Sequence, residues 1–223
     1  MTSRKGVLAI VGPNELTVYN LNSEQDLPQW LPTCKFRLPG GSRLEISPGL
    51  TRLACTAQDK YRVHVYSLEN RRRLQSITHL KQVEDITWRD STAPHRSEII
   101  LYTITVDSTV RIFIPVLDSP DHLQLHASID LHAFGVPRDV GIVSAICWLD
   151  RNAVAMALNS GFEKVLEGSS QDQEEENARR GRLKTIVDEG WDLFAIVTGD
   201  GTVVVRAVTV GDFVATANVF GAY

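Results

Sequence analysis

One hairpin pattern recurs along this chain, and it limits the possible folds more than any other feature of the sequence. The segments Glu98–Val116 and Leu193–Val210 each contain two runs of β-branched and aromatic residues that are joined by a short polar turn. Leu8–Leu21 and Arg52–Leu68 follow the same plan. Two such runs separated by a short turn predict an antiparallel hairpin. The sequence therefore indicates an all-β chain that is built from repeats.

The spacing of the hairpins indicates the kind of repeat. Their turn residues are Pro13, Gln58, Asp107 and Asp200, which are separated by 45, 49 and 93 positions. The first two intervals are close to one four-stranded blade of a WD-repeat propeller, which takes about 40–45 residues, and the third is about two such units. We therefore predict a WD-repeat-like β-propeller that extends over residues 1–223.

The strands of each blade are expected to differ in burial. The run Thr109–Val116 is apolar on both faces, which is typical of an inner strand packed between neighbouring sheets. Arg71–Thr78 and His122–Leu131 alternate polar and apolar residues, as solvated outer strands do. Val83–Asp90 and Val143–Asp150 each place a Trp two residues before an Asp and are interpreted as innermost or entry strands.

Counted together, these pieces give about five partial blades. A closed propeller usually needs more strands, so we expect an incomplete propeller with unpaired strand edges at its two ends. Six residues of the hairpins at Glu98–Val116 and Leu193–Val210 are expected to be buried, because their runs have no face that favours water: Ile104, Ile112, Ile114, Ile196, Val203 and Val205.

One segment departs from the repeat. Residues 163–190 are interpreted as a charged insertion, either helical or disordered. Ser170 and Gln173 form a capping-box pattern, acidic residues precede basic ones, and Gly190 is a typical helix stop. The apolar stripe of this segment is small, so we expect it to contribute little to the core.

Composition excludes several classes of partner and compartment. The net charge of -4 and the isoelectric point near 5.9 provide no positive electrostatic field that would attract a phosphate backbone. No nucleic-acid partner is therefore expected. Cys34, Cys55 and Cys147 form no Cys-x-x-Cys pair and fit reduced, packed thiols in the cytoplasm. The apolar run Val7–Val11 is too short for a signal peptide, and no stretch approaches the ~20 residues that span a bilayer.

Two patterns resemble ligand-binding motifs, and each has a simpler structural interpretation. His122 and His126, with His132 nearby, have the spacing of two zinc ligands on a helix, but they lie on an alternating stretch and are expected to be solvated outer-strand residues. Pro39–Gly49 is rich in glycine but lacks the lysine and following helix of a phosphate-binding loop, so we interpret it as a loop that joins two blades.

The remaining candidates do not indicate catalysis. Trp191–Asp192 precedes a strand, whereas the Trp-Asp signature of WD repeats closes one. The basic run Arg71–Arg73 is suited to an acidic partner or an anionic membrane surface, or it is a solvated outer strand; Glu174–Glu176 are interpreted as a solubilising face. No nucleophile, base and orienting group converge. We therefore expect no catalytic, cofactor-binding or metal-binding residues and no enzymatic activity.

Three blocks of the sequence resemble a known family. The segments "ITWRD", "ILYTITVDSTVRIFIPVLDSPDHLQLHASIDL" and "RLKTIVDEGWDLFAIVTGDGTVVVRAV" are similar to the N-terminal propellers of the DmX-like or rabconnectin family, and most similar to its fungal branch, the large subunit of the RAVE complex. The resemblance runs from about Leu53 to Val208. It implies that this chain is a piece of a much longer protein with tandem propellers and a helical region.

The resemblance also implies a function. Members of this family are cytosolic scaffolds that bring the peripheral and membrane sectors of the vacuolar proton ATPase together. The expected partners are therefore that peripheral sector and the other RAVE subunits, with peripheral attachment to vacuolar or endosomal membranes at most. The repeats alone support an alternative equally well, namely a general propeller adaptor in vesicle trafficking or in a ubiquitin ligase complex.

Overall fold

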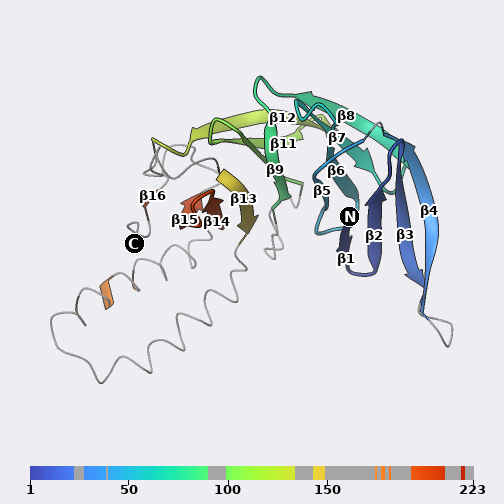
Figure 1. Cartoon of the computed structure of the whole chain (residues 1–223), viewed down its shortest axis with the longest axis horizontal. Helices are drawn as coiled ribbons and strands as arrows, with labels where there is room; N and C mark the ends of the chain where they lie inside the picture. The colour runs from blue at the N-terminus through green and yellow to red at the C-terminus, as the bar shows by residue number, and fades with distance from the viewer. Residues whose placement is uncertain are drawn as a thin grey trace. The chain divides into compact units, whose positions relative to one another are not determined.

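Most of the chain is described by a computed structural model, shown in Figure 1. The described residues are 1–22, 28–38, 40–89, 99–133, 143–148, 174, 177–178, 181, 192–208 and 217–218. The chain divides into two units, Met1–Leu131 and His132–Tyr223, and each is considered by itself.

The first unit contains three four-stranded antiparallel sheets, each formed by consecutive strands. The first sheet consists of β1 (Thr2–Arg4), β2 (Val7–Val11), β3 (Glu15–Asn22) and β4 (Gln29–Arg37). The second consists of β5 (Leu44–Ile46), β6 (Arg52–Thr56), β7 (Arg62–Ser67) and β8 (Arg72–Thr78). The third consists of β9 (Val83–Trp88), β10 (Leu101–Thr105), β11 (Thr109–Val116) and β12 (Ser119–Asp130). Figure 1 shows the sheets in chain order, from blue through teal to green.

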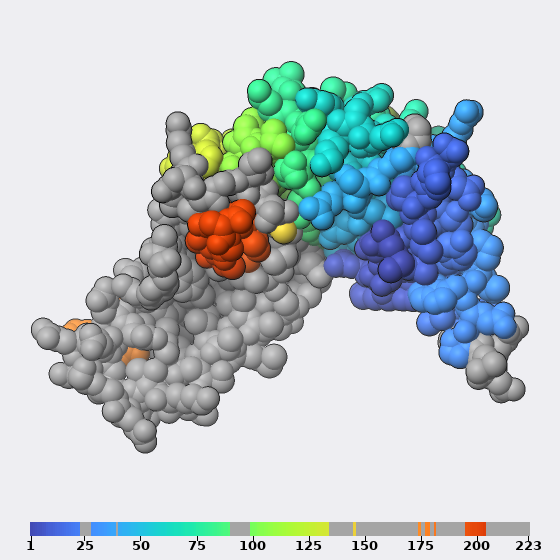
Figure 2. Space-filling model, viewed as in Figure 1, coloured from blue at the N-terminus to red at the C-terminus, as the bar shows by residue number. Residues whose placement is uncertain are grey.

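Apolar side chains fill the spaces between neighbouring sheets of this unit. One cluster joins the first sheet to the second and includes Val18, Phe36, Leu53 and Tyr66. Another joins the second sheet to the third and includes Val65, Trp88 and Leu101, among others. Each sheet between two others must therefore be apolar on both faces, which explains the β-branched runs of the inner strands. Figure 2 shows the three sheets of this unit as one continuous surface from blue to green, with these side chains enclosed between them.

The predicted difference between inner and outer strands is confirmed in the first unit. Of the predicted inner strand Thr109–Val116 (β11), Val110, Ile112 and Phe113 are buried and the other residues are half-buried, and every residue of β10 is buried. The outer strands β8 and β12 are mostly exposed, with single buried residues between exposed ones. Ile104 and Ile112 are buried as predicted. Ile114 is only half-buried, because it follows a register shift between Ile112 and Phe113 and pairs with the exposed Gln124 of the outer strand.

The second unit contains one further sheet of the same type. Its strands are β13 (Val143–Trp148), β14 (Asp192–Thr198), β15 (Val203–Val208) and β16 (Ala217–Asn218), hydrogen-bonded in that order. Ile196 is buried as predicted, but Val203 is 60% exposed. Val203 directly follows the turn and lies on the face opposite to Ile196, whose cross-strand partner is Val204. The side chain of Val205 lies outside the described residues.

The described residues form four sheets, where the sequence indicated about five partial blades. Val83–Trp88 and Val143–Trp148 are the first strands of the third and fourth sheets, which confirms their interpretation as entry strands. Between Asp107 and Asp200, an interval interpreted as about two repeat units, the described residues form β11 and β12 of the third sheet and β13 and β14 of the next. Residues 149–191 separate β13 from β14 in the sequence.

That separating segment includes the predicted charged insertion at 163–190. Glu174, Asn177, Ala178 and Gly181 are helical and exposed, which agrees with the helical alternative at those positions. The capping pair Ser170 and Gln173 lies outside the described residues. Within the described part of the chain, no helix has the length and apolar character that a bilayer crossing requires.

Candidate interaction surface

The connections of the first unit that join its sheets gather at one end, which we name the loop end. In an antiparallel sheet, the turn between the middle strands and the exit from the outer strand lie at the same end. Backbone bonds tie each exit to a neighbouring turn: Leu38 N donates to Asn14 O over 3.1 Å, and Val83 N donates to Lys60 O over 2.7 Å. The loop end comprises residues 12–14, 38, 40–43, 57–61, 79–82 and 106–108.

Two large apolar side chains are exposed together at the loop end. Tyr61 is 41% exposed and Leu80 is 89% exposed. His79 N donates to Tyr61 O over 2.7 Å, so the two connections that carry these side chains are joined directly. Exposed Lys81 and half-buried Lys60 flank them. An aromatic and an aliphatic side chain held in water by an ordered backbone are typical of a protein-binding surface.

The turn that carries Tyr61 is held by an aspartate. Asp59 Oδ1 accepts the backbone N–H of Tyr61 over 3.0 Å, and Asp59 Oδ2 accepts Arg62 Nη2 over 2.7 Å. The Arg62 guanidinium holds the pKa of Asp59 below its usual range. Lys60 has a φ of 60°, a left-handed conformation that a tight turn requires. The aromatic ring is therefore presented by a fixed turn.

The segment that carries Leu80 is anchored by the preceding residue. His79 is buried, its Nε2 lies 2.9 Å from Thr103 Oγ1, and its ring meets that of Phe113 edge-on at 5.7 Å. Burial lowers the pKa of His79 to about 4, so the imidazole is neutral at physiological pH. Leu80 is thus exposed on a connection whose preceding residue, His79, is packed against the third sheet.

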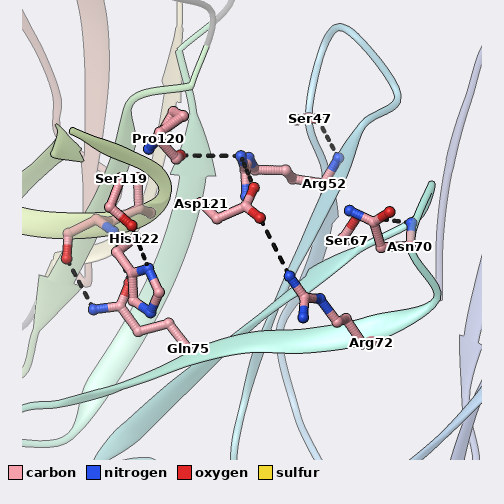
Figure 3. A network of polar contacts seen from close by, with 11 residues as sticks. Ser47, Arg52, Ser67, Asn70, Arg72, Gln75, Ser119, Pro120, Asp121 and His122 are labelled. Carbon is pink, nitrogen blue, oxygen red and sulfur yellow. Dashed lines mark hydrogen bonds and ion pairs between the residues drawn. The ribbon is translucent and has the colours of Figure 1, made fainter. Parts of the chain in front are cut away.

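At the opposite end of the unit, polar groups join the second and third sheets (Figure 3). Arg52 Nη2 donates to Asp121 Oδ1 and to Pro120 O, each over 3.0 Å, and Arg72 Nη2 lies 3.6 Å from Asp121 Oδ2. Gln75 bonds both backbone groups of Leu123, donating over 2.8 Å and accepting over 2.7 Å. These contacts fix one sheet against the next.

Glu45, a half-buried glutamate, lies on β5, the innermost strand of the second sheet. Glu45 accepts the Thr87 hydroxyl and the Trp88 N–H, each over 3.2 Å, and its own carbonyl accepts the Trp88 indole over 3.0 Å. Burial raises the pKa of Glu45 to about 8, although the bonds from Thr87 and Trp88 and the charge of Arg4 oppose the shift. These contacts form a joint between the second and third sheets.

The histidines considered as metal ligands do not converge. His122 and His126 are exposed on the outer strand β12, and His122 Nδ1 lies 3.0 Å from Ser119 Oγ. His132 follows that strand. The described residues contain no group of three or more side chains suited to a metal ion.

The glycine-rich segment leads from the first sheet into the second over residues 40–49, but it is not a loop throughout as predicted, because Leu44–Ile46 form the strand β5. A Cβ on Gly41 would lie 2.6 Å from Thr56 O, so close backbone packing explains this glycine. Cys55 is buried and Cys34 half-buried, and burial raises the pKa of Cys55 to about 12. The side chain of Cys147 lies outside the described residues.

The other sequence candidates are now placed as well. Asp192 begins β14, so the Trp191–Asp192 pair precedes a strand as expected; Trp191 itself lies outside the described residues. Glu174 is exposed. The basic run Arg71–Arg73 begins the outer strand β8.

Sequence reasoning missed Tyr61 and Leu80. Tyr61 follows a turn directly, and Leu80 is a single leucine between His79 and Lys81. An isolated apolar residue in a connection is the one signal that marks such positions, and it does not show whether the side chain turns inward.

Comparison with known proteins supports the fold. No family model matches the chain, and no curated protein matches it. Solved structures do match the chain. Sqt1 of Saccharomyces cerevisiae matches with a TM-score of 0.52 and 11% sequence identity, and the match covers 98% of this chain and 43% of the Sqt1 chain. Hsv2p of Kluyveromyces lactis matches with a TM-score of 0.50 and 12% identity over 95% of this chain and 49% of its own. The chain has a WD40-like propeller fold and spans about half the length of these structures.

Proposed function

We propose that this chain is part of a non-catalytic propeller scaffold that regulates assembly of the vacuolar proton ATPase, and hence vacuolar acidification, as the large subunit of the RAVE complex does. The proposal rests on the sequence resemblance between about Leu53 and Val208 and on the propeller fold. Its partners are the peripheral ATPase sector and other RAVE subunits. The protein acts in the cytoplasm, attached peripherally to vacuolar or endosomal membranes.

The loop end carries the interaction in this proposal. Propeller strands are occupied by packing between sheets, so the connections are the parts that remain for partners. The observation that favours the loop end as the binding surface is the exposure of Tyr61 and Leu80 on hydrogen-bonded connections. Aromatic and aliphatic anchors on a rigid frame lose little conformational freedom when they are buried by a partner.

A pull-down of the intact gene product tests the function. Under conditions where the two ATPase sectors are dissociated, we expect it to recover peripheral-sector subunits. The double variant Tyr61→Ser, Leu80→Ser should recover at least about tenfold less, because two anchors are lost. Leu117→Ser is the matched control, since Leu117 is 93% exposed but lies at the opposite end of the unit.

Recovery of no ATPase subunit by the unmodified protein would contradict the assembly function. Recovery of coat or ubiquitin-ligase subunits in their place would favour the general adaptor. Equal losses for Leu117→Ser and the double variant would exclude the loop end as the binding surface. They would not contradict the assembly function, which is tested by the recovery of ATPase subunits with the unmodified protein.

A further inference from the structure

A groove separates the first and second sheets at the end opposite to the loop end. It is a cavity of about 590 Å³. Its floor is apolar and is formed by Val7 and Val18 of the first sheet and by Leu50 and Leu68 of the second. Asn20, Thr33 and Thr51 add polar groups to its wall.

The basic run at the start of β8 is divided between two faces of the second sheet. Arg72 lies 3.6 Å from Asp121 and so points toward the third sheet. Arg73 pairs across strands with Tyr66, which belongs to the core between the first and second sheets. Successive side chains of a strand point to opposite faces, so Arg73 lies on the groove side of the sheet. Arg71 lines the groove itself.

Arg73 adds a second positive charge on the side of the sheet where Arg71 lines the groove, against the single acid Glu69. Arg71 and Arg73 are both exposed, and within the described part of the chain neither has an ion-pair partner. Glu69 is the one acidic side chain among the lining residues. Cys34, which also lines the groove, supplies no negative charge, because burial raises the pKa of its thiol.

We propose that this groove binds an extended peptide segment in which an apolar side chain is flanked by carboxylates. The apolar side chain enters the floor between the two sheets, and the carboxylates meet Arg71 and Arg73 at the rim. A recessed floor favours a peptide over a lipid surface, because a flat bilayer does not reach into a cavity between sheets. The proposal does not depend on the ATPase as partner, since it concerns another end of the unit.

Fluorescence anisotropy tests the proposal with three labelled heptapeptides: a central leucine between two pairs of glutamates with terminal glycines, the same peptide with serine for leucine, and the same peptide with glutamines for glutamates. With the whole 223-residue chain, we expect the first peptide to bind. Replacement of leucine should weaken binding about tenfold or more, because apolar burial is lost. Replacement of the glutamates should weaken it about fivefold.

Variants within the basic run provide the matched control. Arg71→Gln with Arg73→Gln should weaken binding of the glutamate peptide about fivefold at low salt, and less at high salt. Arg72→Gln should leave it unchanged, because Arg72 points to the other sheet. Unchanged thermal unfolding of the double variant establishes that it is folded.

Three results would overturn the proposal. The first is no binding of the leucine–glutamate peptide at millimolar concentration. The second is an equal loss for Arg72→Gln and the double variant. The third is binding of the chain to phosphatidylserine vesicles through Arg71 and Arg73 while the peptide does not compete, which would assign the arginines to a membrane surface.

Discussion

Glu45 joins two sheets through a carboxyl group that is nearly neutral at physiological pH. With a pKa of about 8 in the folded protein, against 4.5 for an unperturbed glutamate, it is protonated more readily when folded than when unfolded. Its contribution to stability is therefore fully present below about pH 4.5 and is lost as the pH rises through 8. The first unit should become less stable across this range.

Glu45→Gln should remove that dependence. The amide keeps an acceptor for Trp88 N–H and provides a donor to the Thr87 hydroxyl, without a charge to desolvate. At pH 8 we expect the variant to be more stable than the unmodified chain by at least about 1.4 kcal/mol, the free energy of one pKa unit. Near pH 4 the two should agree. Urea unfolding at several pH values measures the difference, and equal curves at every pH would contradict it.

At this scale, sequence patterns predicted burial but not electrostatics. The alternation around Ile104 and Ile112 indicates their burial, because both neighbouring runs are apolar. Nothing in Leu44–Ile46 distinguishes Glu45 from a solvated glutamate. The groups that cover it, Thr87 and Trp88, belong to the next sheet, and the sequence does not show that these strands meet.

At the scale of elements, the repeated hairpins share a hydrogen-bond pattern in their turns. Thr105 Oγ1 donates to Asp107 Oδ1, and Thr198 Oγ1 donates to Asp200 Oδ1 over 2.6 Å. In the first turn, Arg111 Nη1 also donates to Thr105 Oγ1 over 2.7 Å. Thr105 is fully buried, so the aspartate satisfies a hydroxyl that water does not reach.

Asp107→Ala should therefore destabilise the first unit by about 1 kcal/mol, because it removes the shorter hydrogen bond of a buried hydroxyl and leaves the longer one to Thr109 O at 3.3 Å. Asp107→Asn should recover most of the loss, since its amide oxygen still accepts. Asp118→Ala is a matched control in the exposed turn between β11 and β12 and should change stability by less than about 0.5 kcal/mol. Chemical denaturation separates the three. Equal effects of Asp107→Ala and Asp118→Ala would show that the turn bond is unimportant.

The hairpins themselves were predictable, because each is local in sequence. The assignment of strands to sheets was harder to predict from the sequence. The first strand of the third sheet lies next to its hairpin in the sequence, whereas β13 is separated from its hairpin by residues 149–191. Spacing alone does not show that β13 and β14 pair across such a segment.

At the scale of the first unit, the contacts of Arg52 should decide how firmly the second and third sheets are joined. Its side chain is 8% exposed and bonds Asp121, whereas Arg72, which meets the same carboxylate, is 66% exposed. Removing the partner of a buried cation leaves a charge without compensation. The two ion pairs of Asp121 should therefore differ greatly in their contribution.

We expect Asp121→Ala to lower the free energy of unfolding by about 2 kcal/mol, less than for a fully buried pair because Asp121 is 41% exposed and Pro120 O remains. Arg72→Gln should cost less than about 0.5 kcal/mol. Guanidinium unfolding is unsuitable, because it screens charge, so urea is the denaturant. An equal cost for the two variants would show that burial does not distinguish these pairs.

The distance along the chain between β13 and β14 also has a consequence in time. A ribosome adds about 5–20 residues per second, so the 43 residues between these strands (149–191) delay the partner of β13 by roughly 2–9 seconds. The turns of β2–β3, β6–β7 and β10–β11 are short, and these pairs form as soon as both strands emerge. The segment between β13 and β14 is longer than the turns of these other pairs, so the entropic cost of loop closure also opposes pairing most for β13–β14. During synthesis, β13 therefore waits as an unpaired apolar strand, which is the period when a chaperone would bind this chain.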